Sequence, residues 1–126
     1  MKSYTDIEQS KKLAEILPHE SADMYWWPTS IRYYIEAIDD GDFNEEVGHI
    51  RAWSLAALLS VLPNSENKST TLSKGGYRIS TLEQINDWFV DCEDETNGLN
   101  NCITSADNPI DACYEMILKL HELNLL

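Results

Sequence analysis

The chain has 126 residues and a mass of 14.4 kDa, with 22 acidic and 9 basic side chains and a formal net charge of −13. A chain of this length can bury one core without metal or disulfide staples, so we expect a single domain over residues 1–126. The negative charge repels nucleic-acid phosphates and anionic lipid, which disfavours direct nucleic-acid or membrane binding and leaves a basic protein partner open. No apolar run approaches the ~20 residues of a membrane span, and the first residues lack a signal-peptide core, so a cytoplasmic location is expected.

The first helix is expected over Asp6–Leu17. Thr5-Asp6-Ile7-Glu8 has the form of a capping box in which Thr5 is the cap. An apolar stripe follows, and Pro18 ends the helix because it cannot continue it.

The next segment is dense in aromatic and β-branched residues. It predicts strands over Met24–Trp27 and Ile31–Ile35 joined by a turn at residues 28–30, although a short helix over residues 34–38 is an alternative for the second strand. Alternation along a strand sends half of the large rings to each face. Core packing beneath the helices is the expected role of any single ring. The alternative is that the second set, with Trp26 beside Tyr34, forms an exposed protein-binding patch. The candidate interaction residues are Tyr25, Trp26, Trp27, Tyr33 and Tyr34.

The most apolar part of the chain is residues 50–62. It predicts a central buried helix that is capped by Ser54 and ends at Pro63, with Trp53 and Leu58 placed as a hydrophobic staple. Full burial of Leu58 and of Leu59 would each contribute about 1.5–3 kcal/mol.

A hairpin is expected next, because the pair Gly75-Gly76 supplies the positive φ angles of a two-residue turn. With that turn Leu72 would face Ile79, and Lys74 would face Tyr77. Residues 88–92 have the composition of a third strand, whereas residues 94–106, rich in Asn and Gly, are expected to form a loop.

Two acidic segments carry most of the excess charge. Neither fits the calcium hand-loop: counted from Asp40, Glu45 takes the place of the required glycine, and counted from Glu93, Thr104 takes the place of the closing glutamate. They are expected to be solvated loops. The segments contain Glu36, Asp39, Asp40, Asp42, Glu45 and Glu46, and Glu83, Asp87, Asp91, Glu93, Asp94 and Glu95.

The sequence contains no motif for a metal site or for nucleophilic catalysis. The three cysteines are too widely spaced for a zinc knuckle, so we expect reduced, buried thiols. Cys113 and His121 lie about 12 Å apart along a helix and cannot form a dyad unaided. The sequence predicts no catalytic, cofactor-binding or metal site at Cys92, Cys102, Cys113, His19, His49 or His121.

The last helix has the best specified start. Asn108 can cap it, Pro109 suits its first position, and Asp111 favours its positive end. An apolar stripe then faces the core, formed by Ile110, Cys113, Met116, Ile117, Leu120 and Leu123.

Residues 52–63 (AWSLAALLSVLP) and 107–125 (DNPIDACYEMILKLHELNL) resemble a family of short proteins encoded by phages, prophages and conjugative elements of Bacteroides-type gut bacteria. The chain is similar, more loosely, to the phage ABA-sandwich domain. This resemblance implies helices covering a small antiparallel sheet and a phage or mobile-element context, with no catalytic residues to carry over.

We therefore expect an α+β fold in which three helices, near residues 6–17, 54–62 and 109–123, cover one antiparallel sheet of four or five strands. The expected function is that of a non-enzymatic accessory protein that binds another protein or itself. Two alternatives remain: an acidic DNA mimic that occupies a host enzyme, and a hydrolase with an unrecognised site.

Overall fold

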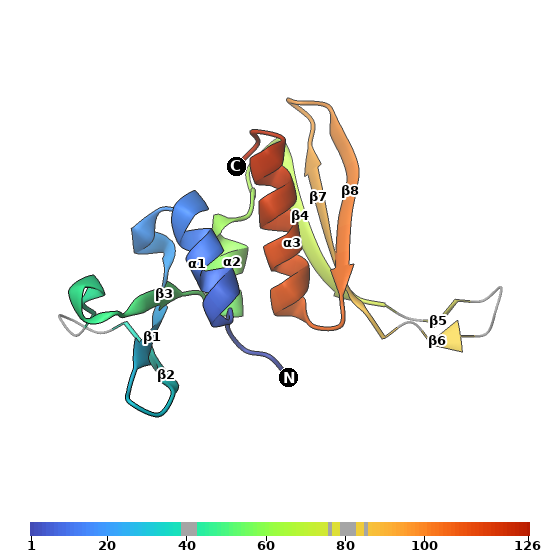
Figure 1. Ribbon diagram of the computed structural model, residues 1–126. Coiled ribbons are helices and arrows are strands. Elements are labelled where there is room, and N and C mark those ends of the chain that lie inside the picture. Colours follow the sequence, from blue (N-terminus) through green and yellow to red (C-terminus); the bar gives the residue numbers. More distant parts are fainter. Residues whose placement is uncertain (39–42, 76, 79–82, 85) are drawn as a thin grey trace. The chain divides into compact units, whose positions relative to one another are not determined.

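The computed structural model describes residues 1–38, 43–75, 77–78, 83–84 and 86–126. The chain forms two compact units: an N-terminal unit, Ser3–Val61, and a C-terminal unit, Met1–Lys2 with Leu62–Leu126. Each unit contains one antiparallel sheet of three strands (Figure 1). The predicted α+β class and three α-helices are confirmed, but the prediction of one sheet with four or five strands is wrong.

The N-terminal unit has two α-helices and a sheet with the strand order β2-β1-β3. The prediction of two strands in the aromatic segment is confirmed, and the competing helix at residues 34–38 does not form. The elements are α1 (Ile7–Ile16), the 3-10 helix η1 (His19–Ser21), β1 (Met24–Pro28), β2 (Tyr33–Ala37), the 3-10 helix η2 (Glu45–Val47), β3 (Ile50–Ala52) and α2 (Leu55–Val61).

Helix α1 is capped by Asp6, so the prediction that Thr5 caps it is wrong. The Asp6 carboxylate accepts the N–H of Gln9 at 2.8 Å, and the Gln9 side chain accepts the N–H of Asp6 at 3.1 Å. This reciprocal pair is a capping box shifted by one residue. Sequence alone could not decide between Thr5 and Asp6, because both residues are good caps.

Thr5 is instead a buried link to the strand β3. Its main-chain N–H donates to the carbonyl oxygen of Trp53 at 2.9 Å, and its hydroxyl accepts the N–H of Trp53 at 3.1 Å. The hydroxyls of Thr5 and Ser10 lie 2.7 Å apart and share a hydrogen bond. Both side chains are fully buried, so this network joins the segment before α1 to the end of β3.

Helix α2 begins after Ser54, as predicted, because the Ser54 hydroxyl accepts the N–H of Ala57 at 3.3 Å. Helix α2 lies within the expected bounds of 54–62, and Ile50–Ala52 before it pairs with β1 as strand β3. The prediction that α2 is buried on most sides is wrong: Leu58 is 0% exposed, but Leu59 is 38% exposed. One face of α2 is therefore in the core and the other faces solvent.

The C-terminal unit is built from a sheet with the order β4-β7-β8 and one long helix, which lies along one face of the sheet (Figure 1). A separate two-stranded sheet joins β5 to β6. The elements are β4 (Lys68–Lys74), β5 (Tyr77–Arg78), β6 (Glu83–Gln84), β7 (Trp88–Asp94), β8 (Leu99–Ala106) and α3 (Pro109–Glu122).

The predicted hairpin at Gly75-Gly76 is wrong. Strand β4 pairs with β7, which places Leu72 opposite Val90 and Lys74 opposite Trp88. Tyr77 pairs with Gln84, and Ile79 and Gly76 lie outside the described residues. Strand β4 pairs with the more distant β7 because, over seven residue pairs, the two strands bury alternate residues on the same sheet face. Val90 and Cys92 of β7 are both fully buried on that face.

Residues 99–106 form strand β8, so the prediction of a loop over residues 94–106 is wrong. The predicted third strand is confirmed and extends to Asp94, where a turn leads into β8. Gly98 has φ +68°, so the Asn97-Gly98 pair makes a hairpin turn between two strands rather than a long loop.

The last helix, α3, follows its prediction. The Asn108 side chain accepts the N–H of Asp111 at 2.9 Å, and Lys2 Nζ lies 2.9 Å from Asp111 Oδ1. Helix α3 contacts the sheet through Cys102 Sγ, 3.8 Å from Met116 Sδ, among other contacts. Its buried apolar stripe is Ile110, Cys113, Met116, Ile117 and Leu120, whereas Leu123, also expected in it, is 48% exposed.

Leu58 and Leu59 offer a matched test of the exposure of α2. Leu58→Ala is expected to cost about 2–5 kcal/mol because it leaves a cavity, and Leu59→Ala less than about 1 kcal/mol. Urea denaturation of both variants measures the difference. Equal losses of stability would contradict the assigned faces of α2.

Thr5 offers a second test. Thr5→Val keeps the shape of the side chain but leaves the buried N–H of Trp53 without its hydroxyl acceptor, so a loss of about 1–3 kcal/mol is expected. Thr5→Ser retains the oxygen and serves as the control in the same denaturation experiment. A Thr5→Val protein as stable as Thr5→Ser would refute this role of the hydroxyl.

Candidate protein-interaction surface

The turn at the tip of the β1–β2 hairpin is fixed by hydrogen bonds of Thr29 and exposes an apolar side chain. The Thr29 hydroxyl accepts the N–H groups of Ile31 and Arg32 at 3.3 and 3.2 Å and donates to the carbonyl of Arg32 at 2.8 Å. These bonds hold the tip in one conformation. Ile31, between these bonded residues, is 87% exposed.

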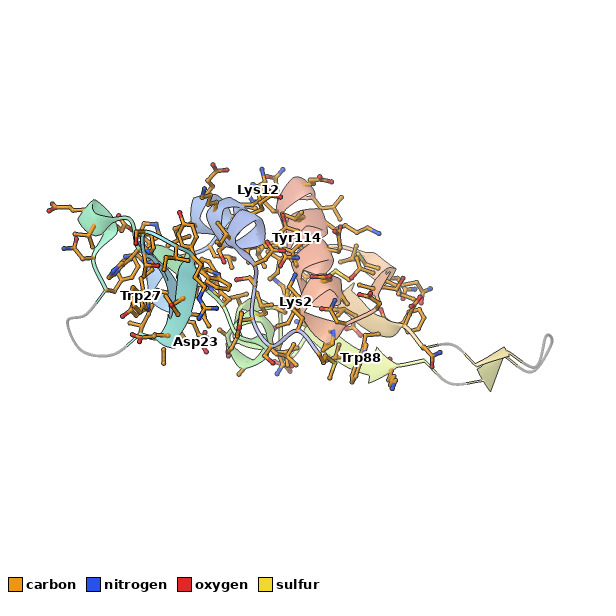
Figure 2. All side chains as sticks on the ribbon, turned by 60° about the horizontal axis from the view of Figure 1, so that its bottom comes forward. Lys2, Lys12, Asp23, Trp27, Trp88 and Tyr114 are labelled. Carbon is orange, nitrogen blue, oxygen red and sulfur yellow. The ribbon has the colours of Figure 1, made fainter. Side chains whose placement is uncertain are left out.

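An aromatic stack lies directly behind this tip. Trp27 and Tyr34 are cross-strand partners whose ring centroids are 4.9 Å apart at an interplanar angle of 26°. The Arg32 guanidinium lies 4.6 Å from the Tyr34 centroid and adds a cation–π contact. Trp27 is labelled in Figure 2. Its Nε1 is buried and has no hydrogen-bond acceptor among the described residues, so the stack with Tyr34 is what positions the ring.

Tyr25 lies on the same sheet face as Trp27 but is buried. Its exposed fraction is 3%, its ring stacks on His49 with centroids 4.8 Å apart, and its hydroxyl donates to Glu36 at 3.1 Å. The imidazole of His49 in turn accepts the N–H of Asn44 through Nδ1 at 3.0 Å, which places its proton on Nε2. Tyr25 and His49 therefore form the packed part of the sheet face that also carries Trp27.

Trp26 points to the opposite face of the sheet. Its indole N–H donates to the carbonyl of Thr5 at 3.0 Å, and its ring meets Tyr4 edge-on with centroids 5.4 Å apart. Trp27, rather than Trp26, is thus the neighbour of Tyr34. Of the five candidate residues, Trp27 and Tyr34 form the stack, Tyr33 is 40% exposed at the sheet edge, and Tyr25 and Trp26 hold the unit together.

Strand β2 is an open edge of the sheet. The Thr29 N–H donates to the carbonyl of Arg32, and the Ile38 N–H donates to the carbonyl of Asp23. These two hydrogen-bonded pairs lie just beyond the two ends of the β1–β2 ladder. Between them, hydrogen-bonded and non-hydrogen-bonded residue pairs alternate along the strands. By this alternation the main-chain groups of Tyr34 and Glu36 face β1. Those of Tyr33, Ile35 and Ala37 face outward, where another extended chain could pair with them.

Sequence reasoning missed a groove of about 430 Å³ in the N-terminal unit. The carboxylate of Glu45 pairs with Arg51, whose guanidinium also lies 4.3 Å from the Phe43 ring centroid. The only sequence signal was the shared helical face of Lys11, Ala14 and Glu15. The groove is lined by Lys11, Ala14, Glu15, Glu45, His49, Ile50 and Arg51.

The thiols are buried and poorly suited to nucleophilic chemistry. All three cysteines are free, as predicted. Burial raises the pKa of the Cys92 thiol, and burial raises the pKa of Cys113 to about 11, so both are protonated at neutral pH. Within the described residues no group of three or more His, Cys, Asp or Glu side chains is arranged to hold a metal ion.

The second acidic segment does not form one row of charges. Along β7, Asp91 and Glu93 alternate with Asp94, which is 2% exposed and points to the opposite face. The Asn97 side-chain amide donates to Asp94 at 2.7 Å and is the main cause that lowers the pKa of this carboxyl below its usual 3.8, assisted by the Asn97 N–H and by Lys68, against the effect of burial. Asp39, Asp40 and Asp42 of the first segment lie outside the described residues.

Comparison of the chain with protein-family models, curated proteins and solved structures gave no match. In the part of the chain that the structure describes, no helix is long and apolar enough to cross a membrane.

The lowered pKa of Asp94 predicts a pH dependence of stability. Because the folded state favours the ionised carboxylate, its contribution is present above the unfolded pKa near 3.8 and is lost as the pH falls through the lower folded value. Asp94→Asn should therefore lower stability at neutral pH, with a smaller deficit below pH 3.8. Denaturant unfolding of both proteins at several pH values measures this, and a deficit that stays constant would contradict it.

Proposed function

We propose that this chain is a non-enzymatic accessory protein of a phage or mobile element, and that it acts by binding another protein through the β1–β2 hairpin. The observation that carries the proposal is the exposure of Ile31 on a turn that Thr29 fixes by hydrogen bonds, next to the Trp27–Tyr34 stack. Aromatic side chains that are already immobilised lose little conformational entropy on binding, and such side chains dominate protein interfaces. The mobile-element context rests on the resemblance of residues 52–63 and 107–125.

The open edge of β2 suggests how the partner binds. An extended segment could pair with the outward main-chain groups of Tyr33, Ile35 and Ala37, while its side chains contact the stack or Ile31. Main-chain pairing of this kind supplies affinity, and the neighbouring side chains supply specificity.

The net charge favours a basic partner. With a formal charge of −13, the chain repels acidic proteins and accelerates encounter with basic ones. The association rate should fall as salt is added, because the charges are screened.

Two exposed apolar residues of the N-terminal unit allow a controlled test. Ile31 is 87% exposed at the hairpin tip, and Val47 is 58% exposed on η2. Ile31→Asp should weaken binding to a partner captured from a lysate of the host by at least about tenfold, or about 1.4 kcal/mol, because it removes a central apolar contact. Val47→Asp makes the same chemical change elsewhere and should bind within about twofold of the unaltered chain.

The experiment requires both variants to melt like the unaltered chain, since both sites are exposed. Equal binding by the Ile31→Asp and Val47→Asp proteins would reject the hairpin as the binding surface. Failure of the unaltered chain to retain any host protein would count against the proposed function as a whole.

A further inference from the structure

The four outer edges of the two three-stranded sheets differ in their protection. Strand β4 has lysines at both ends, and its Lys68 exchanges two main-chain hydrogen bonds with Ser65. Strand β3 is continued by Trp53, whose main chain is bonded to Thr5. Strand β2 contains Glu36. Strand β8, with the sequence LNNCITSA, has no charged side chain at all.

Hydrogen bonds at the two ends of the β4–β7 ladder fix which groups of β8 face outward. Gly75 donates to Asp87 at 2.8 Å, and Glu95 donates to Asn67 at 2.9 Å. Alternation between these ends directs the main-chain groups of residues 89, 91 and 93 to β4, and those of residues 88, 90 and 92 to β8. On β8 the register then directs residues 102, 104 and 106 to β7. Ile103 and Ser105 therefore present their N–H and C=O groups at the open edge.

We infer that the open edge of β8 pairs with the same edge of a second copy of this chain. An antiparallel arrangement centred on Thr104 places Ile103 of each copy opposite Ser105 of the other, so that both outward residues exchange their main-chain hydrogen bonds. Thr104 then faces Thr104, and Cys102 faces Ala106, so the paired β8 strands bring no charged side chain of their own into the contact. Asn101 has φ +56° and leaves the extended conformation, which ends the pairing on that side.

The absence of charged residues on β8 favours this edge over the rest of the surface as the contact between two copies. Two chains of formal charge −13 repel each other, and an uncharged edge is where they can approach with the lowest electrostatic cost. Ile103 is 47% exposed in the single chain and would be partly covered by the pairing. Salt should therefore strengthen this self-association, whereas it should slow association with a basic partner at the hairpin. This inference does not rest on the proposed function.

Two serines flank Phe89 in the same cross-strand row and provide a matched pair of variants. Ser105 lies on the edge strand β8 and Ser73 on β4, and both are exposed. Ser105→Glu introduces a charge into the pairing, and Ser73→Glu introduces the same charge on the same sheet face but away from it. Ser105→Pro removes an outward N–H without removing a bond to β7, because proline is tolerated at such edge positions.

Sedimentation equilibrium of the purified full chain, over a wide concentration range and at low and high salt, tests the inference. The average mass should rise from 14.4 kDa toward twice that value with concentration, and more readily at high salt. Ser73→Glu should behave like the unaltered chain, and Ser105→Glu and Ser105→Pro should raise the dissociation constant at least about tenfold. Far-UV circular dichroism checks that each variant is folded.

Two results would overturn the inference. One is an unaltered chain that stays monomeric at every concentration and salt, which would leave the edge free or reserved for a foreign strand. The other is a dimer that Ser105→Glu and Ser73→Glu weaken equally, or that only Ile31→Asp abolishes, because the contact would then lie elsewhere. If Ser105→Pro alone fails to fold, the comparison of the two glutamate variants decides the question.

Discussion

Each principal sheet of this protein has three strands, and three antiparallel strands cannot close on themselves. In the C-terminal unit α3 covers one face of the sheet, and both outer strands retain one unpaired side. The N-terminal unit has the same limitation at β2. Lysines and main-chain hydrogen bonds to Ser65 and Thr5 protect parts of these edges, and the remaining parts are where another chain could pair. Both of the contacts that we propose therefore lie at the margins of the sheets.

Local signals predicted the elements of this fold better than their partners. Asn108, Pro109 and the apolar stripe of α3 specify that helix because capping and burial act within a few turns. The Gly75-Gly76 pair failed as a hairpin signal because pairing of β4 with β7 depends on residues far along the chain. The candidate site followed the same rule: the aromatic run identified the hairpin, but only the register showed that Trp27 is the neighbour of Tyr34 and that Trp26 faces away.

Several side chains that carry reactive groups make structural contacts in this protein. Cys102 contacts Met116, Tyr25 bonds to Glu36, and Asp94 is held by Asn97 and Lys68. Each of these side chains could serve in a reactive site elsewhere, yet here its polar atom is already satisfied by a neighbour. The exposed apolar residues Ile31 and Ile103 are the opposite case, since no core explains them. The contacts that we propose at the hairpin and at the edge of β8 would cover both.

The residues before α1 also change how the chain should be handled. Such a segment is often treated as a convenient place for a tag or a flexible linker. Here the carbonyl of Thr5 accepts the Trp26 indole, and its N–H binds Trp53, so these residues complete the sheet and core of the N-terminal unit. A protease that trimmed them would leave the main chain of Trp53, which continues β3, without its two hydrogen bonds to Thr5. A tag or linker is therefore better joined to the chain before Thr5 than in place of it.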